Sequence, residues 1–481
     1  MLAVLAPAAP ALAQCAATGT NQTCTNPAGT TVSGPGFGIF DANTLTVTNF
    51  GTISGNVEGI FANNTANVSN FGTITGSNVG GIRGGVVNVS NSGTISSVRG
   101  FGIDGNIVNV TNSGTVSALT LGIGANIANV TNSGTITSTN FGIVANTANV
   151  KNSGTITGAT GIAGLAALST LVNSGTIIGT GGTAIDFSFS NTDTLTFLPG
   201  TRIFGAMLLG SGDRVNINAG RDIAWLLTFT PNGSFTIKGS GSAPFVINGN
   251  QVATLDPTVF GMTDRTLVEF SGAVSSLLQS RFDDLGWLRA LPGGGYAFAP
   301  PEVNGIADSA NTAFAGIPAI AYAGNQGIGT LPNAAVFDPV TRVAVWSQGF
   351  VGSLYQPETD TTLASTNTLY GGAIGVDGPF GPNLSLGAFV GAGNGHLNVD
   401  LNSQSIGTDY VFGGGYGRFD WGAGFLNFAL STGRSANTST RTIADNLSPT
   451  GFDSATATFG GWYVSPELAY GVHLPLNTTR R

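Results

Sequence analysis

The sequence predicts an all-β fold: a right-handed parallel β-helix, then a helical and linker segment, then a partial antiparallel outer-membrane β-barrel. A motif recurs every 20 or 21 residues from residue 37 to about 186. The spacing of apolar residues becomes helical near residue 270, and from about residue 343 it alternates with a period of two. We therefore expect a partial signal peptide (1–14), an N-terminal cap (15–36), the β-helix (37–257), the helix and linker (258–342) and barrel strands (343–481).

The composition excludes some functions. Only 8% of the 481 residues are charged, against about 25% in ordinary soluble domains, and 74 are glycine. The formal net charge of −8 argues against nucleic acid as a partner, because that partner needs clustered Lys and Arg. Beyond the N-terminus there is no run of about 18 apolar residues, so no transmembrane helix is predicted.

The N-terminus is typical of export. Met1 to Gln14 is apolar and ends in the small-residue cleavage pattern Ala11-Leu12-Ala13, although a basic n-region is missing, which places the true start upstream. An ordinary buried segment is the alternative. Cys15 and Cys24 are the only cysteines, and in an exported chain such a close pair predicts a disulfide. A metal site at this pair is not expected, because no histidine lies nearby.

The repeat is the strongest signal in the chain. The pattern Asn-x-Gly-Thr-Ile, with Val once in place of Ile, begins at Asn49, Asn70, Asn91, Asn112, Asn132, Asn152 and Asn173. Leucine-rich repeats would need several leucines and a return segment in each unit, and the calcium-binding nonapeptide repeat would need a recurrent Asp. β-Branched residues separated by Asn, Gly, Thr and Ser suit three short strands with tight turns, which is one coil of a parallel β-helix.

Stacked coils turn repeat positions into columns, of which three are apolar. The first is Ile39, Ile60, Ile82, Ile103, Ile123, Ile143 and Ile162. The second is Val47, Val68, Val89, Val110, Val130, Val150 and Leu171. The third is Ile53, Ile74, Ile95, Val116, Ile136, Ile156 and Ile177. Burying three such side chains stabilises a coil by roughly 5–9 kcal/mol, less than the ordering of about twenty residues costs, so neighbouring coils must supply the rest.

The recurrent asparagines are interpreted as a structural column, because Asn tolerates left-handed turns and stacked Asn side chains hydrogen-bond from coil to coil. A ligand-binding row is the alternative. Arg83 and Asp104 each follow a column isoleucine by one residue in adjacent coils. They should therefore lie close together as a surface ion pair.

No catalytic site, cofactor or metal site is predicted in the β-helix. Both histidines, His396 and His473, lie far outside the repeats, so a catalytic triad or His-ligated metal is hard to build there. Asp41, Glu58 and Asp104 occupy different column positions and make a poor glycosidase pair. We expect the chain not to be an enzyme, and keep a passenger hydrolase as a minor alternative.

A surface that binds a ligand is the more specific alternative to a purely structural repeat. Thr-Ile-Ser or Thr-Ile-Thr recurs in register, for example at Thr52–Ser54 and Thr73–Thr75. Strand alternation should point these hydroxyls outward in two parallel rows, which could contact carbohydrate or ice. The alternative explanation for the recurrence of Thr is that this residue favours exposed strand positions.

The chain from about residue 190 closes the β-helix and leads to a helix. Several apolar residues in this region are still predicted to face the interior of strands: Leu195, Phe197, Ile203, Val215 and Ile217. Thr266 to Arg281 then has helical spacing, with Thr266 and Glu269 as a capping box. The stretch 292–333 is rich in Gly, Ala and Pro and is predicted to be a linker, with a second possible helix at 304–323.

The final part alternates as a lipid-facing barrel requires. In 462–474 an apolar face that begins with Trp462 alternates with a face that carries Glu467 and His473. A barrel with an outward apolar band and a polar lumen needs this pattern, although a soluble sandwich also alternates.

Several segments together resemble autotransporters of the type V secretion class. They are the Asn-Ser-Gly-Thr-Ile coils, Gly249–Pro257, Val345–Phe350 and Tyr463–Tyr470. The resemblance implies a barrel that guides its own β-helix passenger across the Gram-negative outer membrane and leaves it on the cell surface or released. It further implies outer-membrane lipid and the barrel-assembly machinery as partners, surface glycans or proteins as possible ligands, and a pore-threading helix at 266–281 or 304–323.

The C-terminus departs from this family. The family barrel has twelve strands and an aromatic last residue, whereas this chain offers about six strand-like segments and stops at Arg481. We expect a curved partial sheet from 343 onward and further strands in the full-length gene. A barrel completed by another chain is the alternative. An adhesive or structural passenger is the expected function.

Overall fold

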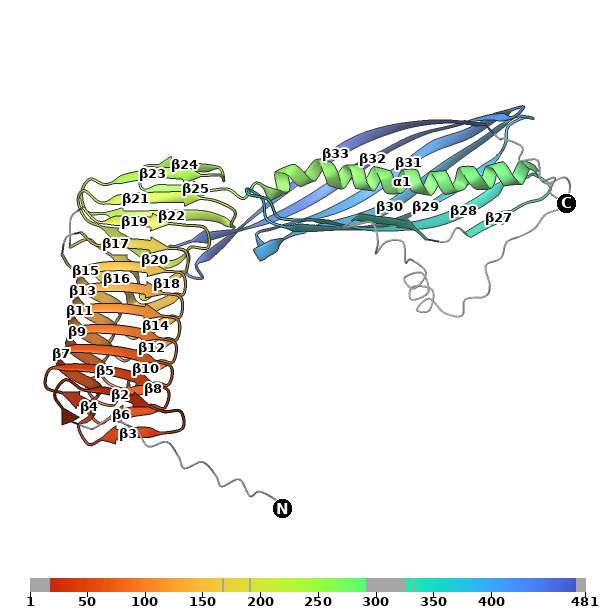
Figure 1. Ribbon diagram of the computed structural model, residues 1–481. Helices are drawn as coiled ribbons and strands as arrows, with labels where there is room; N and C mark the ends of the chain where they lie inside the picture. The colour runs from red at the N-terminus through yellow and green to blue at the C-terminus, as the bar shows by residue number, and fades with distance from the viewer. Residues whose placement is uncertain (1–17, 167, 190–191, 291–325, 332–333, 473–481) are drawn as a thin grey trace, which may run out of the picture. The chain divides into compact units, whose positions relative to one another are not determined.

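The computed structural model describes residues 18–166, 168–189, 192–290, 326–331 and 334–472 (Figure 1). The chain forms two compact units, one of residues 1–255 with 443–453 and one of 256–442 with 454–481. The all-β class expected from the sequence is confirmed: parallel coils make up the first unit, and long antiparallel strands with one helix make up the second.

The first unit is a β-solenoid whose coils stack as three parallel sheets, all hydrogen-bonded in register. Long strands bend and take part in two sheets; they are β7 (Glu58–Asn70), β9 (Gly80–Asn91), β11 (Phe101–Asn112), β13 (Leu121–Asn132), β15 (Phe141–Asn152), β16 (Thr155–Gly164), β18 (Thr176–Asp186) and β20 (Arg202–Leu209). The first sheet also contains β1 (Thr18–Gly19), β4 (Phe37–Asp41) and β22 (Ala224–Pro231).

The other two sheets use the shorter strands. The second sheet contains β2 (Thr23–Asn26), β5 (Thr44–Asn49), β17 (Thr170–Asn173), β19 (Thr194–Phe197), β21 (Arg214–Ala219) and β23 (Thr236–Gly241). The third contains β3 (Thr31–Gly34), β6 (Thr52–Gly55), β8 (Thr73–Gly76), β10 (Thr94–Ser97), β12 (Thr115–Ala118) and β14 (Thr135–Ser138).

The three predicted apolar columns fill the space between these sheets. Every isoleucine of the first column is fully buried, as is every member of the third, and Val110 in the second is 4% exposed. Adjacent coils hold the columns in register, so that Ile103 lies opposite Ile82 and Val116 opposite Ile95. The expectation of three inward columns is therefore confirmed.

The glycine before each first-column isoleucine has a packing reason. A Cβ atom added at Gly81 would lie 2.6 Å from the carbonyl oxygen of Gly102 and 2.8 Å from Cγ2 of Ile95. Any larger residue would therefore push adjacent coils apart, or push the third column away from the first. Gly-Ile recurs because only glycine fits beside the third column.

The register begins before the recognised repeat. Within the segment expected to be an N-terminal cap, Cys24 lies opposite Val47, Asn26 opposite Asn49 and Val32 opposite Ile53. Cys24 and Val32 continue the second and third columns as buried side chains. Residues from 18 onward thus add a coil in the same register, although they lack the Asn-x-Gly-Thr-Ile motif.

The other end of the solenoid closes with antiparallel pairing. The hairpin of β24 (Phe245–Asn248) and β25 (Gln251–Thr254) pairs β25 with β22. The predicted strand interiors Leu195, Phe197 and Val215 are fully buried. Asn446, from the segment 443–453 of the same unit, is buried and bonds through its amide to backbone atoms of Gly205 and Thr228.

The second unit is an antiparallel sheet of long strands. Two short strands, β26 (Gln326–Thr330) and β27 (Ala334–Phe337), pair with β28 (Ala344–Gln356). Sequential pairing then joins β28, β29 (Ser365–Pro379), β30 (Leu384–Val399), β31 (Gln404–Trp421) and β32 (Gly424–Asp445), and β33 (Phe452–Val472) is the last strand. A short 3-10 turn, η1 (Asp400–Asn402), separates β30 from β31.

The helix is longer than the sequence predicted. Helix α1 spans Thr258–Ala290, so Thr266 and Glu269 lie inside it and the capping box is wrong. The side chain of Asp256 accepts the backbone N–H of Thr258 and thus caps the helix eight residues earlier than predicted. Glu269 instead accepts a hydrogen bond from Asn367. No helix among the described residues is long and apolar enough to cross a membrane, and the possible helix at 304–323 lies outside them.

The strand alternation is confirmed, but the predicted polar lumen needs correction. Val345, Val390 and Trp462 are exposed on one face of the sheet. The other face is aromatic where α1 lies against it: Phe270 of the helix stacks on Tyr410 at 3.8 Å between ring centroids, and Trp346, Phe350, Phe389 and Phe412 are buried around it. The helix supplies an apolar stripe to that face, so large side chains fill space that water would otherwise occupy.

Polar contacts between helix and sheet lie beyond this aromatic cluster. Arg281 of α1 forms a two-pronged ion pair with Asp377 of β29, at 2.5 and 2.7 Å. Tyr416 donates a hydrogen bond of 2.6 Å to the same carboxylate, and Trp346 donates one of 2.7 Å to the Tyr416 oxygen. The buried guanidinium is thus neutralised by a carboxylate that is itself held by a second donor.

Candidate functional site

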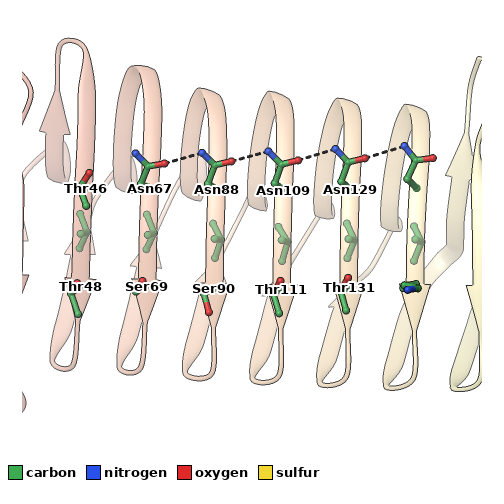
Figure 2. Close-up of a pocket in the computed structure, with 18 of the residues that line it drawn as sticks. Thr46, Thr48, Asn67, Ser69, Asn88, Ser90, Asn109, Thr111, Asn129 and Thr131 are labelled. Atoms are coloured by element: carbon green, nitrogen blue, oxygen red, sulfur yellow. Dashed lines mark hydrogen bonds between the residues drawn. The ribbon is translucent and has the colours of Figure 1, made fainter.

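A long shallow groove runs along the outside of the second sheet and crosses β5, β7, β9, β11, β13, β15 and β17 (Figure 2). Its volume is about 640 Å³. Each central coil contributes three consecutive residues: an asparagine on one wall, a second-column valine whose backbone forms the floor, and a hydroxyl residue on the other wall. The central coils supply Asn67–Ser69, Asn88–Ser90, Asn109–Thr111 and Asn129–Thr131.

The asparagine wall is a continuous hydrogen-bonded row. From Asn88 onward, each Nδ2 donates to the Oδ1 of the preceding coil over 2.7 to 3.0 Å (Figure 2). The row ends with Thr170, whose hydroxyl donates to Asn149. An amide has two N–H donors and an oxygen with two acceptor positions, and this row uses one donor and one acceptor of Asn88, Asn109 and Asn129. The remaining donors and acceptors repeat along the groove.

The opposite wall consists of hydroxyls, followed by a lysine and then Val172 in the last two coils. Thr48, Ser69, Ser90, Thr111 and Thr131 lie in register, and Lys151 occupies the same position in the next coil. The lining residues include no aspartate, glutamate or histidine. The groove therefore offers paired donors and acceptors without a strong electric field.

The predicted Asn column lies one residue beyond this wall and is separate from the groove. Its side chains are almost fully buried, and each Nδ2 donates to Oδ1 of the next coil at 2.7 to 2.9 Å. The row includes Asn49, Asn70, Asn91, Asn112, Asn132, Asn152 and Asn173, and Asn26 joins it at the N-terminal end. These amides also donate to backbone carbonyls, such as that of Thr115 for Asn91. A buried row of this kind satisfies turn carbonyls and leaves no face for a ligand.

The threonine rows predicted as a binding face occupy the third sheet. Ile53 and Ile74 are buried there, while Thr52, Ser54 and Thr75 are partly exposed and in register. The groove lies instead on the neighbouring sheet, and sequence reasoning missed it. The recurrent Asn-Val-Ser/Thr triplet could have predicted it. The valine of each triplet predicted the second core column, but the outward Asn and Ser/Thr beside it were not used.

The charged cluster of the solenoid differs from the predicted ion pair. Asp104 lies opposite Arg83 in register, but the ion pair within bonding distance joins Arg83 to Glu58 at 3.0 Å. The Arg83 guanidinium lies over the ring of Phe61, the preceding residue in its column, and this contact directs it toward the earlier coil. Burial raises the pKa of Glu58 to about 7, against the opposing effect of Arg83.

The structure describes only some of the remaining predicted positions. Cys15 and His473 lie outside the described residues, so the disulfide between Cys15 and Cys24 stays a prediction. His396 lies on β30 of the second unit. Within the described ranges no three His, Cys, Asp or Glu side chains are grouped so as to hold a metal ion.

Comparison with known families adds one finding. Residues 345–480 match the family model described as Autotransporter beta-domain, a region that contains nearly all of β28 and the whole of β29 to β33. No curated protein and no solved structure matches the chain.

Proposed function

This chain is a type V autotransporter, with its barrel domain in the outer membrane and its β-solenoid passenger at the cell surface, and from that premise we propose that the passenger is an adhesin. The family match confirms the resemblance expected from the sequence. Outer-membrane lipid and the barrel-assembly machinery follow as partners of such a domain. What the passenger does at the surface is the part we propose.

The groove on the second sheet carries this proposal. A passenger that serves only as a stalk needs a buried core that holds its coils together. The apolar columns and the buried Asn column supply that core. The second, outer asparagine row leaves amide groups free along a groove of about 640 Å³. Unused donors and acceptors that repeat along a groove favour contact with a partner.

An enzymatic passenger has less support than an adhesive one. General acid–base catalysis needs a titratable group within reach of the substrate, and the groove lining offers only Lys151. Glu58 has a raised pKa, but it is buried and paired with Arg83 on another sheet. We therefore infer contact without chemistry.

We further infer that α1 is the segment that fills the barrel interior. The sequence left two candidates for this role, and α1 contains the first of them. Its support is the aromatic cluster around Phe270 and the buried pair of Arg281 with Asp377. Both contacts join the helix to the face of the sheet opposite the exposed valines.

The test uses cells that display the full chain. Surface exposure is checked by added protease, and adhesion is measured as the fraction of cells retained under flow on epithelial or plant-cell surfaces. The double variant Ser90→Glu/Thr111→Glu places two carboxylates in the groove and should reduce retention to the level of cells without the protein. Ser90 and Thr111 are both exposed, so folding should tolerate the change.

The matched control is Ser96→Glu/Ser117→Glu on the third sheet, in the same two coils. These residues lie on the predicted threonine face and line no part of the groove. Normal retention with this control, and loss with the groove variant at equal surface protein, supports adhesion through the groove. If the groove variant, the control variant and cells without the protein are all retained to the same extent, adhesion through the groove is contradicted.

A further inference from the structure

We propose that the groove binds an extended, uncharged polysaccharide that runs along the solenoid axis, and that the stacked pair Phe50 and Phe71 is the platform for a sugar ring at its N-terminal end. This inference names the ligand class of the proposed adhesin and rests on that function. Four features of the groove and its border support it: repeat distance, charge, hydrogen-bonding capacity and aromatic surface.

The repeat distance of the groove suits an extended polymer. Identical groups recur once per coil, at the strand spacing of about 4.8 Å. In an extended glycan each monosaccharide advances the chain by about one ring length, close to that spacing. One sugar per coil therefore meets an amide and a hydroxyl group in each of the four central coils, from Asn67 to Thr131.

The charge of the groove excludes ionic polymers. Lys151 is the one charged residue of the lining and stands near one end. Anionic polysaccharides and nucleic acids need repeated cations, and cationic polymers need repeated carboxylates. An uncharged chain alone matches walls of amides and hydroxyls.

The unused hydrogen-bonding groups fit sugar hydroxyls. Each outer amide of Asn88, Asn109 and Asn129 keeps one N–H donor and one acceptor position, and a hydroxyl row faces it across the groove. A sugar hydroxyl donates and accepts at once, so it can bond to either wall. A polypeptide backbone has separate donors and acceptors in fixed alternation, and the one-directional amide row does not match it.

The aromatic pair lies at the corner that borders the hydroxyl wall. Phe50 and Phe71 follow Asn49 and Asn70 directly, two residues after the groove residues Thr48 and Ser69. Their rings stack with centroids 4.9 Å apart and planes 10° apart, and they are 46% and 55% exposed.

This corner position is occupied differently in later coils. Ser92, Ser113 and Ser133 stand where the first two coils have phenylalanine. A half-exposed pair of stacked rings presents an apolar aromatic surface to solvent, and such a surface suits the C–H face of a sugar. The platform therefore marks one end of the groove and gives the bound chain a direction.

The first experiment measures binding by the purified full chain in detergent. The probes are the neutral hexasaccharides cellohexaose and mannohexaose, with hexagalacturonate as the anionic comparison, in isothermal titration. We expect at least one neutral probe to bind and the anionic one not to bind. Binding of hexagalacturonate alone, or of no probe, overturns the ligand class.

The second experiment locates the site with a matched pair on β13. Asn129→Asp removes the amide donors in the groove, whereas Asn126→Asp makes the same change at an exposed asparagine outside the lining, which accepts a bond from Asn146. The first variant should weaken binding about tenfold and the second should leave it unchanged. Thermal unfolding of both is measured, and Thr111→Val serves as a second groove variant. Equal affinities of all variants overturn the site.

The third experiment tests the platform. Phe50→Ala/Phe71→Ala should weaken hexasaccharide binding about tenfold. Phe189→Ala, at an exposed ring that is not part of the groove lining, should not. Unchanged affinity of the double variant overturns the platform while the groove stands. Loss of cell retention with the groove variants, without binding of any sugar probe, overturns the ligand class but not the adhesin.

Discussion

Asn112 donates a hydrogen bond of 2.8 Å to Asn132 in the next coil, and both side chains are almost fully buried. The same Nδ2 contacts the carbonyl oxygens of Gly114 and Thr135, while Oδ1 accepts from Asn91. One side chain thus satisfies donors and acceptors in three successive coils. Its loss must affect all three.

We predict that Asn112→Ala lowers the free energy of unfolding of the passenger by about 2–5 kcal/mol, because buried partners in adjacent coils lose their bonds. Denaturant unfolding of the full chain, followed by circular dichroism, measures the change. Asn109→Ala in the outer row is the control, and should cost under about 1 kcal/mol because water replaces its partners. Equal costs at the two positions would mean that the buried column has no special structural role.

A second prediction concerns the core. Val110→Asp places a carboxylate in the second column, where the valine is 4% exposed, and should destabilise the passenger by several kcal/mol, on the order of 3–5. The neighbouring Thr111 is exposed, so Thr111→Asp should change stability by less than about 1 kcal/mol. Thermal unfolding of both variants gives the answer. Near-identical midpoints would contradict the inward direction of residue 110.

The sequence predicted the solenoid well because its period is expressed in every coil. A register of three columns leaves one way to stack Ile95 on Ile74 and Val110 on Val89, and the structure uses it. The groove was missed for a related reason: outward residues such as Asn109 and Thr111 lie between buried ones, and a pattern search for core positions passes over them. The groove itself arises because two rows of outward side chains stand in register on either side of the strand backbone.

Contacts between non-repeated residues were predicted less well. Arg83 and Asp104 are neighbours in register, yet the ring of Phe61 draws the guanidinium toward Glu58. The start of α1 at Thr258 depends on the side chain of Asp256 as a cap, whereas an equally plausible capping pattern occurs within the helix. Local patterns fix which elements exist, and individual side-chain contacts decide where they begin and what they pair with.

A third prediction concerns pH. The pKa of Glu58 is raised from 4.5 to about 7, chiefly by burial. A carboxyl group with a raised pKa in the folded state stabilises the fold fully below its unfolded pKa, and this contribution is lost as pH rises through the folded pKa. The free energy of unfolding should therefore fall between pH 4.5 and about 7 by an amount on the order of 3 kcal/mol from this group.

Glu58→Gln removes this titration while it keeps the size of the side chain. Thermal unfolding of the full chain at a series of pH values should show the variant gaining stability relative to the unmodified protein as pH rises through this window. The ion pair with Arg83 forms only with the ionised carboxylate, so its effect is already contained in the pKa of Glu58. Parallel curves for the two proteins would contradict the raised pKa.

The last prediction concerns the anchor between α1 and the sheet. Asp377→Asn leaves the Arg281 guanidinium buried without its carboxylate, a loss of about 3–5 kcal/mol, and should lower the temperature at which the folded form disappears in heat-modifiability gels. The double variant Arg281→Gln/Asp377→Asn removes both charges and should regain much of that stability, because no uncompensated charge is left buried.

Asp420→Asn is the control, since Asp420 pairs with Arg418 at a site where its side chain is 26% exposed. If the single variant at residue 377 behaves like this control, the helix is held by the aromatic packing around Phe270 and not by the ion pair. If the double variant is as unstable as the single one, the uncompensated charge of Arg281 is not the cause of the loss.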